Sequence, residues 1–210
     1  MTPGALVVRD RGPRLVPVTR TQAERRASTQ GKILDATVDA LVHVGYAGAS
    51  TTEICKRAGV SQGALFRYWP TKGELLADAA QHLVGRVTAA YEQAFTGRGG
   101  VGAREALEQL WETYRLPDLQ AAVELYVAAR TDPDLAAALA RIEPAHRANL
   151  HRIAIEVLDP GLVALPGFAD FVELALAAVQ GAAMSAAVVD TSQDTVLGAL
   201  EQVINLLDPR

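Results

Sequence analysis

Apolar side chains recur every three or four positions along most of the chain, and no stretch alternates steadily between apolar and polar residues. Spacing of three to four residues is typical of one buried helical face, whereas alternation would indicate strands. The clearest run is Ile33, Leu34, Thr37, Val38, Leu41 and Val44. The sequence therefore predicts an all-α fold.

Capping residues, glycines and prolines divide the chain into about nine helices. T-x-x-E capping boxes, which satisfy free backbone N–H groups at a helix start, begin at Thr21 and Thr71. Gly59 separates two short helices, and Pro160 and Pro166 bracket a turn. The expected helices span 21–45, 51–58, 61–69, 71–95, 102–115, 119–130, 133–157, 167–189 and 192–207.

Charge is distributed unevenly along the chain, although the net charge is only −4. Residues 1–72 contain eleven Lys and Arg against five Asp and Glu, whereas residues 73–210 contain nine against nineteen. A basic first third joined to an acidic remainder indicates that one end contacts a polyanion. Chance clustering of charges is the alternative at this stage.

The segment from Ser50 to Trp69 meets the demands of a helix-turn-helix. Two short helices must cross steeply, with the second free to enter the major groove. Gly59 tolerates positive φ at the turn, and Cys55 and Ala58 are small enough for a close crossing. A surface helical hairpin without a ligand is the alternative. The apolar anchors expected to hold the pair on its support are Ile54, Val60 and Leu65.

The outer face of the third helix is then left for contacts with DNA. Gln62 can hydrogen-bond a base edge, and Arg67 can reach a guanine or a phosphate. Small residues beside them let the helix lie close to the bases, and free N–H groups at the starts of the second and fourth helices favour phosphate. The expected contacts are Ser50, Thr51, Thr52, Ser61, Gln62, Gly63, Ala64, Arg67, Tyr68 and Lys72.

A family resemblance becomes specific over the run from Ile33 to Leu76, which contains GVSQGALFRYWPTKGELL. This run closely resembles the DNA-binding domain of the TetR family, whose usual pattern is G-V-S-x-G-x-L-Y-x-Y/H-F-x-S/T-K-x-x-L. The resemblance implies an omega-shaped homodimer of nine-helix subunits. In such a dimer, helices one to three bind DNA and the larger domain binds a small effector.

By position, the resemblance implies a base contact at Gln62 and positioning contacts at Thr52, Tyr68 and Lys72. Two residues depart from the family pattern. Phe66 stands where tyrosine is usual, so a phosphate-contacting hydroxyl is missing, and Trp69 replaces phenylalanine. We therefore expect Phe66 to be a core residue.

The chain is expected to have three parts: a basic disordered tail at 1–19, the helix-turn-helix domain at 20–70, and an effector-binding and dimerisation domain at 71–210. The arginines of the tail either reach the minor groove or flanking phosphates, or are simply solvated. The helix at 71–95 spans both larger parts. This helix is expected to transmit a conformational change from the effector site to the DNA-binding helices.

Helices between about 102 and 180 are expected to enclose the effector pocket. The candidate contacts there are Trp111, Tyr114, Tyr126, Arg130, His151, Phe171 and Gln180. Each could equally be ordinary core or surface. Small residues from 181 to 187 and the apolar stripe from Leu197 to Leu207 suit an interface between two copies, with core packing as the alternative.

Nothing in the sequence favours an enzyme, a metal site or a cofactor. The four histidines lack the H-E-x-x-H spacing, and a single cysteine excludes an internal disulfide and a cysteine-built metal centre. There is no signal peptide pattern, so a cytoplasmic location is expected. The longest apolar stretch, at 174–189, has 16 residues. A membrane span needs about 20, so no membrane contact is expected.

The sequence predicts a DNA-binding transcriptional regulator that responds to a small-molecule effector. A repressor on a near-palindromic operator is the default that the resemblance implies. An effector-independent DNA-binding protein is the alternative, and an enzyme is a remote third.

Overall fold

The computed structural model describes residues 22–186, 188–189 and 193–207, and its regular elements there are all helices. They are α1 (Gln22–Gly48), α2 (Thr51–Ala58), α3 (Gln62–Phe66), α4 (Lys72–Phe95), α5 (Ala103–Tyr114), α6 (Pro117–Ala129), α7 (Pro133–Val157), α8 (Pro160–Val163), α9 (Phe168–Ala186) and α10 (Gln193–Leu207). The prediction of an all-α protein is confirmed. The basic tail and the predicted cap at Thr21 lie outside the described residues.

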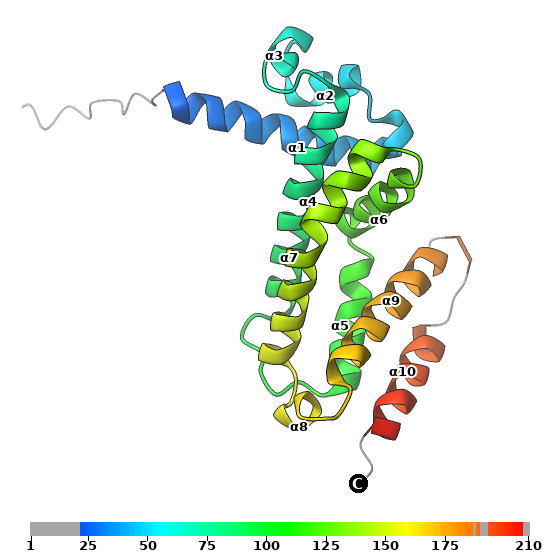
Figure 1. The fold of residues 1–210 in the computed structure, drawn as a ribbon. Coiled ribbons are helices and arrows are strands. Elements are labelled where there is room, and N and C mark those ends of the chain that lie inside the picture. Colours follow the sequence, from blue (N-terminus) through cyan, green and yellow to red (C-terminus); the bar gives the residue numbers. More distant parts are fainter. Residues whose placement is uncertain (1–21, 187, 190–192, 208–210) are drawn as a thin grey trace, which may run out of the picture.

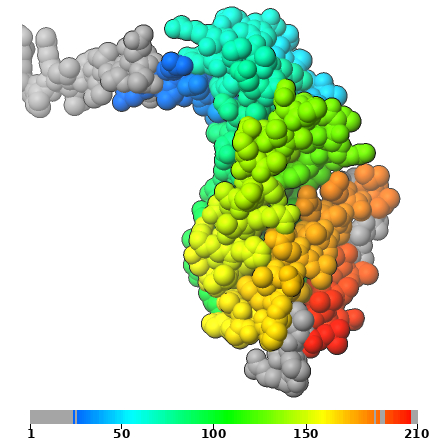
Figure 2. Space-filling view, viewed as in Figure 1, coloured from blue at the N-terminus to red at the C-terminus, as the bar shows by residue number. Residues whose placement is uncertain are grey.

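The helices α1 to α3 form one end of the molecule, and α4 leads from that end into the rest (Figure 1). α4 packs lengthwise against α7, which is its most extensive partner, and also against α1 and α6. α9 and α10 lie side by side on one flank and pack against α5. In Figure 2, α10 lies toward the end opposite to α2 and α3.

Side-chain caps and one glycine shape the turn between α2 and α3. The Ser50 hydroxyl accepts the Glu53 N–H at 3.2 Å, and the Ser61 hydroxyl accepts the Ala64 N–H at 3.2 Å. Each bond satisfies one of the free donors at a helix start. Between the helices, Gly59 has φ 65° and ψ 35°, the left-handed conformation that the sequence predicted for the turn.

α3 ends at Phe66, earlier than the expected limit at 69. The N–H groups of Tyr68 and Trp69 both donate to the Leu65 carbonyl, at 2.9 and 3.1 Å, which tightens the chain into a turn. Trp69 precedes Pro70, and a residue before proline disfavours the helical conformation. The turn therefore brings the indole ring into the core.

The helix α8 occupies the stretch for which the sequence predicted only a turn. Pro160 stands in its first turn, and Asp159 caps it by accepting the Gly161 N–H at 2.7 Å. The segment is a single helical turn of four residues. It makes ten helices in the described part of the chain, one more than predicted.

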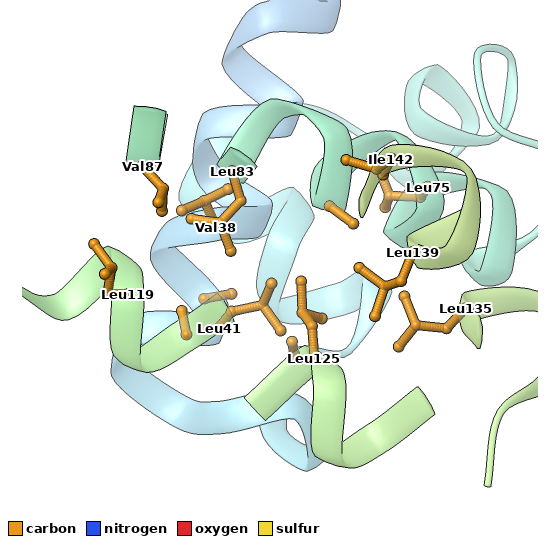
Figure 3. Close-up of a cluster of buried hydrophobic side chains, with 14 of the residues drawn as sticks. Val38, Leu41, Leu75, Leu83, Val87, Leu119, Leu125, Leu135, Leu139 and Ile142 are labelled. Carbon is orange, nitrogen blue, oxygen red and sulfur yellow. The ribbon is translucent and has the colours of Figure 1, made fainter. Parts of the chain in front are cut away.

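A single apolar cluster joins α1 to α4, α6 and α7 (Figure 3). Val38 and Leu41 of α1 belong to it together with Leu83, Leu125 and Leu139, and all five are almost fully buried. Complete burial of such a side chain contributes about 1.5–3 kcal/mol to folding. The cluster therefore couples the packing of α1 to that of α4, α6 and α7. A second, smaller cluster joins α5, α9 and α10.

α9 is the one helix within the described ranges that could span a membrane by length and composition. One of its faces packs in the smaller cluster. Leu174 and Met184, which are each 45% exposed, are left uncovered. The helix therefore has one packed and one open apolar face. The buried residues of its packed face are Phe171, Val172, Ala175, Val179 and Ala183.

Replacing Gly59 with alanine should lower the free energy of unfolding by about 1–2 kcal/mol, because an L-residue is strained in the left-handed region. An added Cβ would meet no atom within 4 Å, so the cost comes from the backbone alone. Gly85→Ala is the matched control, since it also meets open space but lies within α4. It should raise stability by up to about 1 kcal/mol. Chemical denaturation measures both, and equal stabilities would contradict the prediction.

Candidate nucleic-acid interface and ligand cavity

α3 presents Gln62, Gly63, Phe66 and Arg67 to solvent and turns Leu65 into the core. Residues four apart share a helical face, so Phe66 lies beside Gln62 and Arg67 beside Gly63. The expectation that Phe66 is a core residue is wrong, because its side chain is 40% exposed. So short a helix buries one face only, and Leu65 already occupies it.

A hydrogen bond between α2 and α3 holds the side chain of Gln62. Its Nε2 donates to the Thr52 hydroxyl at 2.9 Å, and both residues are exposed. The hydroxyls of Ser50 and Ser61 are engaged as helix caps. Two of the predicted contact residues, one on each helix, therefore position each other.

The turn that follows α3 is fixed to both α4 and α1. The Trp69 indole N–H donates to the Asp78 carboxylate at 2.8 Å. The Tyr68 ring lies 5.8 Å from the Trp69 ring, and the Arg26 guanidinium stands 5.6 Å from the Tyr68 ring centroid. Sequence reasoning did not find Arg26, because no local pattern links it to a residue so far along the chain.

Tyr46 connects the end of α1 to α6 and α7. Gly45 has φ 66°, which interrupts the helix and frees the Tyr46 N–H to donate to the Glu124 carboxylate at 2.8 Å. The Tyr46 hydroxyl donates to Asp132 at 2.7 Å, and burial together with this bond raises the pKa of Tyr46 to about 12. The Lys72 ammonium stands 5.4 Å from the ring centroid. We call Gly45, Tyr46, Lys72, Glu124 and Asp132 together the Tyr46 joint.

A cavity of about 280 Å³ lies among α4, α5, α6, α7 and α9. Three tyrosines line it, namely Tyr91, Tyr114 and Tyr126. The rings of Tyr91 and Tyr114 meet edge to face, with centroids 6.2 Å apart. The charged and ionisable residues that line it are Glu143, His146 and Arg147 of α7 and Glu173 of α9.

The polar residues of the cavity form a continuous network across three helices. The Tyr126 hydroxyl donates to Glu143, whose carboxylate also accepts the Arg147 Nε–H at 2.7 Å. Arg147 extends to Glu173 of α9, and His151 contacts the same carboxylate at 2.8 Å. The hydrogen bond with His151 is the main cause of the lowered pKa of Glu173.

His146 is the exception to this pairing. Its Nδ1 is buried and has no hydrogen-bond partner within the described part of the chain. Burial lowers the pKa of its imidazole. Pro144 lies inside α7 between Glu143 and His146, so the helix lacks one backbone donor at this point.

The predicted effector contacts lie in five different places. Tyr114, Tyr126 and Gln180 line the cavity. Phe171 lines a separate apolar cavity of about 90 Å³. His151 lies behind Glu173, and Trp111 is buried in the smaller cluster. Arg130 is exposed at the end of α6 and lines neither cavity.

Sequence reasoning missed the four ionisable residues of the cavity wall, Glu143, His146, Arg147 and Glu173. The signal available for three of them was their spacing, because residues 143, 146 and 147 share one helical face. Within the residues described, no group of three or more His, Cys, Asp or Glu side chains could hold a metal ion.

Comparison with known proteins identifies the family. Residues 33–79 match the family described as bacterial regulatory proteins, tetR family. An HTH-type transcriptional regulator of Mycobacterium tuberculosis is 36% identical over 164 residues, which are 74% of this chain and 77% of the relative. The chain belongs to the TetR family. It is a DNA-binding transcriptional regulator, and the helices α2 and α3 are its helix-turn-helix.

Solved structures of transcriptional regulators share the fold over most of its length. A transcriptional regulator from Rhodococcus sp. Rha1 matches with a TM-score of 0.62 at 25% identity, over 85% of this chain and 95% of that one. A regulator from Saccharomonospora viridis, solved in complex with choline, matches with a TM-score of 0.64 at 14% identity. That match covers 85% of this chain and 96% of the other.

Two neighbouring substitutions should separate the two faces of α3. Phe66→Ala should change the free energy of unfolding by about 1 kcal/mol or less, because the ring is partly in solvent already. Leu65→Ala should lower it by about 2–5 kcal/mol, since Leu65 is fully buried. Urea denaturation followed by circular dichroism gives both values. Comparable losses in the two variants would show that Phe66 is packed after all.

Proposed function

We propose that this TetR-family protein is a repressor that a small molecule releases from DNA. It binds a near-palindromic operator as a homodimer in the cytoplasm. The observation that carries this proposal is that α6 and α7, which wall the cavity, also hold α1 through the Tyr46 joint. A ligand that favours one setting of these helices changes the position of α1, and with it that of α3.

The division of labour follows the order of the helices. Residues 20–70 bind DNA, and residues 71–210 bind the effector and form the dimer. Gln62 and Arg67 contact base edges, and the exposed Phe66 beside them supplies an apolar contact of the kind that suits a thymine methyl group. Thr52, whose hydroxyl holds Gln62, and Tyr68 are positioning contacts with the operator. The other proposed contacts with the operator are Ser50, Thr51, Ser61, Gly63, Ala64 and Lys72.

The uncovered apolar face of α9 and α10 supports a dimer. Besides Leu174 and Met184, Leu206 of α10 is 82% exposed, and α9 and α10 lie against each other. A second copy that presents the same two helices covers this surface by two-fold symmetry. The same symmetry places two copies of α3 on successive turns of the operator.

The fold relative from Saccharomonospora viridis, solved with choline, supports an effector role for the larger domain. The direct test has two steps. Selection of bound duplexes from a random DNA library gives the operator, and a thermal-shift screen of small molecules gives ligands that stabilise the protein. A stabilising ligand should weaken operator binding by at least about tenfold. Ligands that stabilise the protein without changing operator affinity would favour an effector-independent regulator instead.

Arg67→Ala should weaken binding to the selected duplex by about 1–3 kcal/mol, because a charged contact with a base or phosphate is lost. Arg115→Ala removes another exposed arginine, beyond the end of α5, and serves as the control. It should bind like the parent. Fluorescence anisotropy measures both at fixed salt. If folded Arg67→Ala keeps the parent's affinity, α3 does not read this duplex as proposed.

A glutamate on the apolar face should separate the dimer, because association would then bury an unpaired charge. For Met184→Glu and Leu206→Glu, we expect the dimer dissociation constant to rise by about 100-fold or more. The control is Val127→Glu on α6, since Val127 is apolar and 52% exposed but lies on neither α9 nor α10. Sedimentation equilibrium measures the dimer dissociation constant of each variant. A dimer that survives both changes has its interface elsewhere.

A further inference from the structure

The charges that line the cavity do not balance. Glu143 and Glu173 contribute two carboxylates, and Arg147, which pairs with both, is the one permanently charged cation among the lining residues described. His146 also lines the cavity, and burial favours its neutral form. His151 contacts Glu173 from behind but is not part of the lining. The cavity wall is therefore left with an excess of negative charge.

Aromatic rings add to this preference. The faces of tyrosine rings attract cations, and tyrosines line the cavity from three different helices. An ammonium group interacts favourably with the carboxylates and the rings together, whereas an anion would add to the negative charge.

Apart from Gln180, the rest of the cavity wall is apolar, and the cavity continues toward a second one. Tyr91, Leu150 and Leu176 line both the larger cavity and the smaller apolar one. The smaller cavity, about 90 Å³, is lined almost wholly by apolar side chains. An occupant therefore has a polar end against Glu143 and Glu173 and an apolar end toward Leu150 and Leu176.

We propose that the cavity binds a small organic cation, with its ammonium group against the carboxylates of Glu143 and Glu173, beside the Arg147 that bridges them, and an apolar or aromatic body against the tyrosines. This inference rests on the proposed function, since it names the chemical class of the effector for the same cavity. The volume of about 280 Å³ sets the size. It is close to the lower limit of ordinary ligand pockets, about 300 Å³, so the occupant is small.

Three probes of similar shape and different charge test the proposal on the full-length protein. They are 2-phenylethylamine, a cation at neutral pH, 2-phenylethanol, which is neutral, and 3-phenylpropanoate, an anion. Isothermal titration calorimetry should show the amine binding at least about tenfold more tightly than the alcohol and the anion. An amine that binds no better than the other two, or that does not bind, overturns the proposal.

Isosteric variants locate the binding. Glu143→Gln and Glu173→Gln should each reduce the affinity for the amine by about tenfold and leave the affinity for the alcohol unchanged. Glu156→Gln is the control, because Glu156 is an exposed carboxylate of α7 outside the cavity and pairs with Arg152. Two cavity variants that fold and still bind the amine like the parent would place the cation elsewhere.

The same probes separate this inference from the proposed function. An amine that binds through Glu143 and Glu173 but leaves operator affinity unchanged supports the cation site and contradicts its role as the effector site. A neutral or anionic probe that binds more tightly than the amine and releases the operator has the reverse meaning. In that case the effector role stands and the cation assignment fails.

Discussion

The apolar cluster that joins α1 to α4, α6 and α7 is the packing on which the rest of the structure depends. A helix-turn-helix is too small to build much core of its own, so α2 packs on α1, α3 packs on α2, and α1 packs on α4 and α6. Close-packed interiors transmit displacement because they leave few voids to absorb it. The orientation of α3 is therefore tied to the arrangement of α4, α6 and α7.

Hydrogen bonds at the edge of this cluster fix the position of α1 more closely than apolar packing alone. Apolar packing tolerates small sliding movements, whereas the hydrogen bonds of Tyr46 with Glu124 and Asp132 require particular distances and angles. The bond between Trp69 and Asp78 does the same for the turn after α3. From the sequence, α4 alone was expected to connect the two regions. The structure adds α6 and α7 as direct partners of α1.

Features with a local cause could be predicted from the sequence. The left-handed turn at Gly59 and the start of α7 at Pro133 both arise from residues within a few positions of each other. Phe66 could not be placed correctly, because its exposure depends on where a five-residue helix ends. The cavity wall was also out of reach, since its network joins residues that come together only when α6, α7 and α9 pack.

Pro144 gives α7 an unusual mechanical property. A proline within a helix removes the hydrogen bond to the carbonyl four residues earlier, here that of Ala140, so the rod is more easily bent at this position than elsewhere. On one side of it, Asp132 binds Tyr46, and on the other, Arg147 and His151 bind Glu173. The helix is therefore most easily bent near Pro144. This position lies beside Glu143 and Arg147 in the wall of the cavity.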